Sequence, residues 1–347
     1  MLDKKVAVVA MSGGVDSTAV AMMLLDQGYR VTGLHMRVAP GVGEEAHQDF
    51  LKVAGALGIE ARVVDLSEPF KRHVTDYFVR AYARGLTPNP CVACNRHIKF
   101  GALLEETRRL GAYYLATGHY VRLLENTEGE IEVRLPRFRE KDQTYMFYNL
   151  DQERLRHILT PLGEVDSKEE LRNLVKTLGL PLHQKKDSQE ICFIEDNDYG
   201  RYLKEQGIDE GKGRFISTEG EDLGPHRGIV HYTIGQRKGL GRSFGRPMYV
   251  LEIRPGTREV VLGPDEALYR KELILNEVNF ISRTPGFENP TRVSGKIRYA
   301  HEGAPCLVTT EGDKARVVFD KPQRAVTPGQ SMVFYEKDRL LGGGIIL

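Results

Sequence analysis

The chain has 347 residues, of which 41% are hydrophobic and 28% are charged. This length suits two or three globular domains with sizeable cores, and four cysteines are too few for a disulfide-stapled scaffold of this size. The formal net charge of +1 provides no overall field for a polyanion, so a nucleic-acid surface must come from local clusters of basic residues.

The N-terminal segment has no basic region followed by an apolar run and a small-residue cleavage site. No stretch of the chain reaches the ~20 apolar residues that span a bilayer. We therefore expect a cytoplasmic protein with no membrane partner. Thiols in that reducing compartment are available for metal binding or for chemistry.

The first third of the chain alternates strands with helices. Apolar strands are predicted at 5–11, 31–36, 60–66 and 113–119. Helices are predicted at 16–27, about 44–57, about 68–84 and about 97–109. Near-continuous Val, Ala and Leu strands separated by helices are typical of a parallel sheet covered on both faces. The sequence thus predicts an α/β fold with a doubly wound parallel sheet, whose ligands gather at the carboxyl ends of the strands.

The pattern changes its period after residue 120. Two alternating runs around 126–130 predict a β-hairpin inserted in the sheet domain, followed by short helices at about 151–159 and 167–178. From about residue 204, short alternating runs separated by Gly and Pro predict β-rich structure. We expect three domains, which are the α/β domain at 1–203, a small β-rich central domain at 204–266 and a C-terminal β-barrel at 267–347.

The segment AMSGGVDST, residues 10–18, lies between the first strand and the first helix. Backbone N–H groups and the helix dipole make an anion site at such a turn, and Ser12 and Ser17 add hydroxyls. Asp16 can cap the helix or help to hold a metal ion. The loop lacks the lysine of the G-x-x-x-x-G-K-[ST] motif, which disfavours cleavage at the γ-phosphate, and it lacks the spaced glycines of a dinucleotide fold. A plain glycine turn with a capping residue is the simpler alternative.

S-G-G-x-D-S after a first strand resembles the pyrophosphate loop of ATP-dependent adenylating enzymes. The resemblance implies that ATP is split between its α and β phosphates and that a carbonyl oxygen is activated as its adenylate. This chemistry makes an unreactive C=O into a leaving group that a weak nucleophile can displace.

Two cysteines, Cys91 and Cys94, stand three positions apart in TPNPCVACNRHIKF, residues 87–100. The spacing alone leaves a zinc clip, a redox pair or sulfur-transfer chemistry open, and the reducing compartment disfavours a disulfide. Cys192, in ICFI, has the apolar neighbours of a buried structural cysteine. Cys306, in APCLVTT, has the same context, and we assign it no chemistry.

Six segments occur in a fixed order along nearly the whole chain, namely TPNPCVACNRHIKF, LATGHY, KDQTYMFY, DSQEICFI, HYTIGQRKGLG and TPGQSMVFY. Together they resemble the tRNA-specific 2-thiouridylase family. The resemblance implies that the wobble uridine (U34) in the tRNA anticodon loop is adenylated at its C2 oxygen and then receives sulfur, with release of AMP and pyrophosphate. It also implies ATP and Mg2+ as cofactors and a sulfur-donor protein that delivers a persulfide.

The same resemblance assigns roles to individual residues. Cys94 is the implied nucleophile and Cys192 the implied persulfide carrier, which suits a transfer in which one thiol holds the sulfur and another releases it by exchange. The implied ATP-binding residues are Ala10, Met11, Ser12, Gly13, Gly14, Val15, Asp16, Ser17, Met36 and Gly118. The implied contacts to the target base are Asn89, Pro90 and Cys91, and those to tRNA are His119, Lys141, Asp142, Gln143, Arg298, Tyr299 and Gln330.

Cys91 departs from the family pattern, which usually has an aspartate three positions before the nucleophile. A thiol cannot imitate a carboxylate, so an acid/base role at this position is in doubt. Cys91, Cys94 and Cys192 resemble the ligand set of tRNA thiolases in the same adenylating group that hold a [4Fe-4S] cluster by three cysteines. Two alternatives stay open: zinc with His97 or water as a fourth ligand, and a cluster-free persulfide relay with Cys91 as a resolving thiol.

A basic loop at 226–246 carries five Arg or Lys, five Gly and no Asp or Glu. Such a loop can follow a phosphate backbone closely, and we expect Arg237 and Lys238 to contact tRNA. A second basic stretch lies at 134–141. A solvated basic loop is the plainer interpretation of either stretch.

Two other functions remain open from the sequence. An adenylating amidotransferase or ligase that acts on a small molecule would use the same loop, but it would not need the distant thiols or the basic loop. A zinc-stabilised RNA-binding protein with a vestigial nucleotide loop would bind tRNA without releasing AMP.

Overall fold

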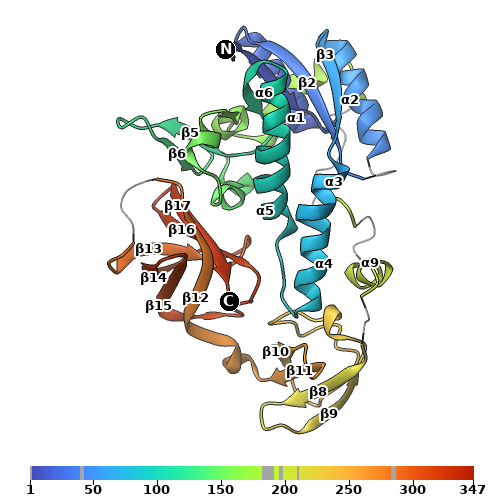
Figure 1. Cartoon of the computed structure of the whole chain (residues 1–347), viewed down its shortest axis with the longest axis vertical. Helices are drawn as coiled ribbons and strands as arrows, with labels where there is room; N and C mark the ends of the chain where they lie inside the picture. The colour runs from blue at the N-terminus through green and yellow to red at the C-terminus, as the bar shows by residue number, and fades with distance from the viewer. Residues whose placement is uncertain (1, 40–42, 182–190, 195–197, 209–210, 283–286) are drawn as a thin grey trace.

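The computed structural model describes residues 2–39, 43–181, 191–194, 198–208, 211–282 and 287–347. In these residues the strands form three sheets, of five, four and eight strands. Figure 1 shows the four-stranded sheet at the bottom and the eight-stranded sheet on the left, with a layer of helices between them and the N-terminal part. No helix of the described ranges is both long and apolar enough to cross a bilayer.

The five-stranded sheet is parallel throughout and has the order β3-β2-β1-β4-β7. Its strands are β1 (Asp3–Ala10), β2 (Arg30–Arg37), β3 (Glu60–Asp65), β4 (Ala112–Ala116) and β7 (Ile158–Leu159). Strands β2 and β3 are added in turn on one side of β1, and strands β4 and β7 are added in turn on its other side. The strand order therefore reverses between β1 and β4, and ligands of such sheets bind outside the carboxyl ends at this point.

Helices cover both faces of this sheet. Ala7 and Val9 of β1 pack into a core with α1 (Val15–Asp26), α2 (Glu44–Leu57) and α8 (Lys168–Lys176), whereas Val8 packs into a core on the other face. Because both faces are buried, β1 reads as a continuous apolar run rather than an alternating one. The predicted doubly wound parallel sheet is confirmed.

The second face is covered by two helical runs that each contain a π-helical segment. The first run consists of α3 (Ser67–Phe70), η1 (Lys71–Thr75) and α4 (Asp76–Ala83), and the second of α5 (Pro90–Cys94), η2 (Asn95–Ala102) and α6 (Leu103–Arg109). Segments η1 and η2 are π-helices, which close each turn over five residues and often lie at functional sites.

The second run begins at Pro90, which is seven residues before the predicted start at 97. The Asn89 side chain caps it by accepting a hydrogen bond from Val92 N at 3.2 Å, and Pro90 stands at the first helical position, where its missing N–H has no cost. The prediction was wrong here because the double-proline segment was taken as a loop up to the cysteines. Both cysteines of CVAC are therefore helical.

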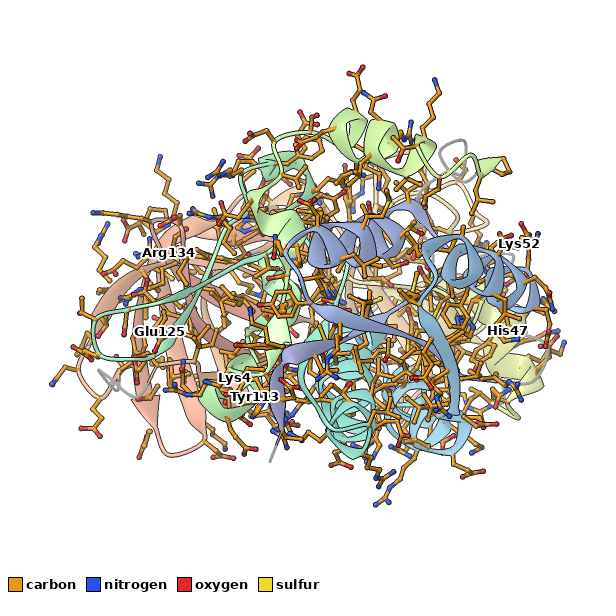
Figure 2. All side chains as sticks on the ribbon, turned by 90° about the horizontal axis from the view of Figure 1, so that it is seen from above. Lys4, His47, Lys52, Tyr113, Glu125 and Arg134 are labelled. Carbon is orange, nitrogen blue, oxygen red and sulfur yellow. The ribbon has the colours of Figure 1, made fainter. Side chains whose placement is uncertain are left out.

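The predicted hairpin is present as β5 (Arg122–Glu125) and β6 (Ile131–Arg134), but it does not belong to the parallel sheet. It extends the eight-stranded sheet, because β6 pairs with β17 (Arg339–Ile346). Arg134 reinforces this junction by an ion pair with Asp338 at 2.7 Å. In the view from above, Glu125 and Arg134 lie on the side of the molecule away from His47 and Lys52 (Figure 2). The hairpin is thus inserted between β4 and β7 along the chain, as predicted, but it pairs with the barrel sheet.

The central four-stranded sheet has the order β10-β11-β8-β9. Its strands are β8 (Gly213–Ser217), β9 (Asp222–His226), β10 (Tyr249–Arg254) and β11 (Glu259–Gly263), and the helix α9 (Tyr199–Glu205) precedes them. Its core reaches the α/β part through Phe78 of α4. The predicted β-rich central region is confirmed as a fold class.

The C-terminal strands close into a barrel, since β12 pairs with both β15 and β17. They are β12 (Tyr269–Phe280), β13 (Thr291–Lys296), β14 (Ala304–Glu311), β15 (Lys314–Arg324), β16 (Ser331–Glu336) and β17. Cys306 is fully buried in the barrel core, as the structural interpretation expected.

The barrel and the α/β part share one hydrophobic core. Val333 and Leu340 of the barrel pack with Tyr145 and Phe147 of the segment 144–148, and the Tyr145 hydroxyl donates to Ser331 O at 2.6 Å. The remaining short elements are η3 (Arg139–Lys141), η4 (Thr144–Phe147), α7 (Gln152–Leu155), η5 (Pro161–Glu164), η7 (Ile229–His231) and η8 (Asp265–Leu268). This junction holds barrel residues against the carboxyl edge of the parallel sheet.

Candidate active site

The loop between β1 and α1 presents backbone N–H groups at the carboxyl edge of the sheet. Gly13 has φ +71°, and a Cβ there would lie 2.5 Å from the Ala46 carbonyl oxygen, so a side chain has no room. Gly14 is the N-cap of α1 and has no side chain to occupy the first N–H groups of the helix. These groups and the positive end of the helix dipole favour an anion.

Hydroxyl groups hold the same loop from the helix side. Ser17 Oγ accepts from Ser12 N at 3.3 Å, and Thr18 Oγ1 donates to Gly14 O at 2.8 Å. Ser17 and Thr18 are buried, whereas Ser12 is exposed. These hydrogen bonds from α1 fix the loop, and Ser12 faces solvent at the opening of the anion site.

Asp16 is the charged centre of the loop. Its carboxylate accepts a hydrogen bond from the Tyr120 hydroxyl at 2.9 Å and forms an ion pair with Lys168 from α8. Gly118 packs against it closely, since a Cβ there would lie 3.0 Å from Asp16 Cβ. Sequence reasoning missed Tyr120 and Lys168. Lys168 follows a capping serine, Ser167, and such a lysine is normally an exposed helix residue.

Met36 is the residue before the last of β2 and is partly buried. Its neighbour His35 donates from Nδ1 to Met11 O at 2.9 Å and stacks on Phe50 with ring centroids 5.4 Å apart. Burial lowers the pKa of His35, so the imidazole is uncharged at neutral pH. On the β2 side, the loop therefore faces an uncharged imidazole stacked on an aromatic ring, with Arg37 and Glu44 nearby.

The end of β4 connects the nucleotide loop to the thiols. His119 is 6% exposed, and its Nε2 accepts a hydrogen bond from Lys99 Nζ at 3.4 Å. Because an ammonium group can only donate, the proton of the ring is on Nδ1, which donates to Thr117 Oγ1 at 2.8 Å. Burial and the Lys99 charge hold the pKa of His119 well below its usual range. The ring is thus a neutral positioning group for Lys99.

Three of the four thiols are electrostatic neighbours. Cys94 is buried, whereas Cys91 and Cys192 are exposed. Burial raises the pKa of Cys94 to about 12, and Cys192 and Cys91 raise it further, while the Lys99 charge opposes them. Burial likewise raises the pKa of Cys91 and Cys192, and Lys99 lowers both. The fold therefore brings together cysteines 98 positions apart along the sequence.

The π-helical segment η2 explains how Lys99 reaches the thiols. Its turns close over five residues, so Lys99 returns to the side of the helix that carries Cys94. An ordinary α-helix repeats every 3.6 residues and would direct a residue five positions later elsewhere. Lys99 lies within the motif at 87–100, but its role could not be predicted, since a π-turn has no recognisable signal in the sequence.

The position of Cys192 depends on an aromatic anchor. The adjacent Phe193 packs edge-on against Phe70 and Phe78, with ring centroids 5.8 and 5.4 Å apart. This contact fixes the segment 191–194 on α3 and α4. The first half of the segment DSQEICFI, up to Glu190, lies outside the described residues.

The three thiols have the donor chemistry of iron–sulfur ligation. In the described ranges, however, no three His, Cys, Asp or Glu side chains are grouped closely enough to hold a metal ion. His97, the candidate fourth zinc ligand, instead stacks on His73 with ring centroids 4.5 Å apart. Neither metal arrangement fits the geometry of these side chains.

Barrel residues and the segment 141–143 border the exposed side of Cys91. The Tyr299 hydroxyl donates to Asp142 O at 2.8 Å, and Lys296 pairs with the Asp142 carboxylate at 3.8 Å. Tyr299 is 43% exposed, and burial raises its pKa, with smaller contributions from Asp142 and Cys91. This arrangement leaves an open aromatic face beside a thiol, which suits a flat base.

Three other residues predicted to contact tRNA form hydrogen bonds with backbone groups, and one of them, Gln330, joins the barrel to the α/β part. Gln330 donates from Nε2 to Thr87 O at 2.8 Å, directly before the helix that carries Cys91. Gln143 Oε1 accepts from Tyr120 N at 3.0 Å, and Arg298 donates to Arg324 O at 3.3 Å. Lys141 is half-buried at the end of η3.

The basic loop at 226–246 belongs to the central part of the chain. Arg237, Lys238, Arg242 and Arg246 are exposed. Gly235 lies against the barrel, since a Cβ there would lie 2.7 Å from Ala325 Cβ. The loop therefore forms a basic rim that continues from the central sheet toward the barrel.

The fold and this edge define a class: a nucleotide-binding α/β domain with a pyrophosphate-type loop, followed by two β-domains. Three family models match the chain in that order, described as the tRNA methyl transferase HUP domain at 4–196, the tRNA methyl transferase PRC-barrel domain at 200–264 and the aminomethyltransferase beta-barrel domain at 270–346.

Curated relatives match over the full length. The tRNA-specific 2-thiouridylase of Acetivibrio thermocellus is 46% identical over 99% of this chain and 100% of its own, and that of Clostridioides difficile is 45% identical over 99% and 98%. The protein of the same name from Carboxydothermus hydrogenoformans is 46% identical over 100% of this chain and 98% of its own. The chain belongs to the tRNA-specific 2-thiouridylase family.

Proposed function

We propose that the chain is an ATP-dependent tRNA-uridine 2-sulfurtransferase that converts the wobble uridine (U34) of tRNA to 2-thiouridine. The observation that carries the proposal is the meeting of a lysine-free nucleotide loop and three thiols at one edge of one sheet, connected through Thr117, His119 and Lys99. The names of the full-length relatives agree with it. We place the reaction in the cytoplasm.

The ATP half of the reaction uses the loop at 10–17 with Met36 and Gly118. The backbone N–H groups and the α1 dipole would hold the phosphates of Mg-ATP, and the Asp16 carboxylate, which pairs with Lys168, would help to hold Mg2+. The uridine C2 oxygen attacks the α-phosphorus, the bond to the β-phosphate oxygen breaks, and pyrophosphate leaves. The product is a C2–O–AMP adenylate, whose leaving group is AMP.

The sulfur half uses Cys192 as the carrier and Cys94 as the releasing nucleophile. The terminal sulfur of a Cys192 persulfide attacks C2 and AMP departs, which leaves the base joined to Cys192 through an S–S bond. The Cys94 thiolate then attacks the Cys192 sulfur, so that 2-thiouridine leaves as the thiolate and a Cys94–Cys192 disulfide forms. A thiol reductant supplies two electrons to regenerate both thiols.

A partner must load the carrier. Cys192 is exposed, so a sulfur-donor protein that carries a persulfide can reach it by thiol exchange. The alternative of a [4Fe-4S] cluster would need Cys91, Cys94 and Cys192 as its ligands, and these side chains are not grouped for it among the described residues. We favour the persulfide relay because each exchange step needs only two sulfur groups to meet, whereas a cluster needs three cysteines grouped around it.

The other candidate functions use less of this site. Methyl transfer, which the descriptions of the family models name, requires neither ATP cleavage nor exchanging thiols. A small-molecule ligase would leave Tyr299, Asp142 and the basic loop without a role. The tRNA 2-sulfurtransferase reaction accounts for all of them.

A reconstituted reaction tests the proposal. Protein purified without oxygen, incubated with Mg-ATP, a persulfide donor and a tRNA transcript, should form 2-thiouridine at the wobble position and about one AMP per base modified, measured by mass spectrometry. AMP release without tRNA would favour the small-molecule ligase. Stoichiometric iron and acid-labile sulfide, lost in the Cys91→Asp variant, would replace the relay with the cluster.

The basic loop should act through phosphate contacts alone. Changing Arg237 and Lys238 together to alanine should weaken tRNA binding and reduce the slope of log K against log salt by about two, since each phosphate neutralised contributes about 0.9. ATP binding should not change. Binding measured between about 50 and 200 mM salt decides the matter, and an unaltered slope would remove this loop from the tRNA surface.

A further inference from the structure

A cavity of about 210 Å3 lies on the reverse side of the helices that carry the thiols. It is enclosed by α4 with η1, by α5 with η2, and by the ends of the barrel strands, and it is larger than the roughly 150 Å3 that accepts a benzene ring. Asn89, Val92 and Arg96 line it at intervals of three and four residues, which places them on one helix face. Cys91 and Cys94 fall on the opposite face, so the reaction described above does not use this cavity.

The walls carry an excess of positive charge. Arg72, Arg80 and Arg96 contribute three guanidinium groups, and Glu277 contributes one carboxylate, 59% exposed and 4.0 Å from Arg96. Within the described part of the chain, Arg72 and Arg80 form no ion pair or hydrogen bond. Guanidinium groups without a partner around a cavity are suited to a phosphate.

Two further features of the cavity indicate a ligand larger than a phosphate ion. His73 and His97 form a flat wall, stacked with an angle of 12° between their planes, and burial and the charges of His73 and Arg96 lower the pKa of His97 to about 4. Asn149 is 7% exposed, and its side-chain oxygen has no hydrogen-bond donor among the described residues. A flat aromatic wall and a buried acceptor call for a ligand with a planar ring and an N–H or O–H donor.

We propose that this cavity is a second nucleotide-binding site, which holds a phosphate on Arg72, Arg80 and Arg96 and places base or ribose donors against Asn149. The nucleotide comes either from the tRNA substrate, in which case the site depends on the proposed function, or from a free nucleotide. The π-helical segments η1 and η2 carry the two stacked histidines, and η2 also carries Lys99. A ligand in this cavity would therefore contact the same helical run, α5 with η2, that carries Cys91, Cys94 and Lys99.

The test titrates uridine 5′-monophosphate and inorganic phosphate separately into the full chain while a non-hydrolysable ATP analogue saturates the first site. The Arg72→Ala/Arg80→Ala variant should weaken UMP binding about tenfold or more, and Glu277→Gln should strengthen it about twofold. Arg109→Ala removes a single positive charge at the far end of the second helical run, outside the cavity, and serves as the control for a loss of charge elsewhere on the chain. Inorganic phosphate should bind more weakly than UMP.

A parallel arm measures the Kd of tRNA and the KM for tRNA and ATP in the same variants. A rise in the tRNA values with an unchanged KM for ATP assigns the nucleotide to tRNA, and an effect confined to UMP assigns it to a free nucleotide. No difference between the double variant and Arg109→Ala in either arm overturns the proposal, as does phosphate binding as tight as that of UMP. A wild-type chain that thiolates no tRNA would contradict the proposed function, while the UMP titration would still decide this site.

Discussion

Changing Cys94 to serine should stop turnover and leave tRNA covalently attached to the protein. In the proposed relay the base is first joined to Cys192 through an S–S bond, and only the Cys94 thiolate cleaves that bond. A serine hydroxyl is not deprotonated at neutral pH and does not exchange with disulfides. The adduct should appear as a band of protein plus tRNA on a denaturing gel, with one AMP released, and a thiol reductant should dissolve it.

Two variants separate this outcome from a general loss of structure. Cys192→Ser should give neither adduct nor thiolation, because the carrier itself is absent. Cys306→Ala alters a thiol that is fully buried in the barrel core and should retain activity. An adduct that persists in Cys192→Ser, or Cys94→Ser protein that still turns over, would rule out the assigned order of the two thiols.

The parallel sheet and its loop could be predicted because their signals are local. Apolar runs of the right length, a glycine pair after the first strand and the absence of a P-loop lysine all lie within about twenty residues. The position of the hairpin could not be predicted in this way. Arg122–Arg134 alternates as any hairpin does, and its membership of the barrel sheet is decided by pairing with residues such as Arg339, some 200 positions later.

The thiol site shows the same division. The sequence identified Cys91 and Cys94, and the family resemblance added Cys192. Neither indicated that Lys99 would act on these thiols or that Lys168 would pair with Asp16. Lys99 reaches the thiols through a π-turn, and Lys168 reaches Asp16 across 152 positions. Charged residues on amphipathic helices normally face solvent, so these two became recognisable only when the fold placed a thiol or carboxylate beside them.

Changing Lys99 to methionine should slow sulfur transfer and move its pH dependence to higher pH. Burial raises the pKa of Cys91, Cys94 and Cys192, and the Lys99 charge is the group that lowers all three. Below its pKa a thiol has less thiolate as that pKa rises, by a factor of about ten for each unit, so loss of the charge should slow single-turnover transfer at pH 7.5.

The pH profile distinguishes this electrostatic role from a structural one. Since thiolate is the reactive form, the rate should rise with pH in both proteins, and the curve for Lys99→Met should be displaced to higher pH, with the two rates converging in alkaline solution. Lys99→Arg keeps the charge and should restore most of the rate. ATP–pyrophosphate exchange in the presence of tRNA should remain unchanged, because Lys99 contacts His119 and not the nucleotide loop. A uniformly slower rate with an unshifted profile would mean that Lys99 supports the fold of η2 rather than the thiolates.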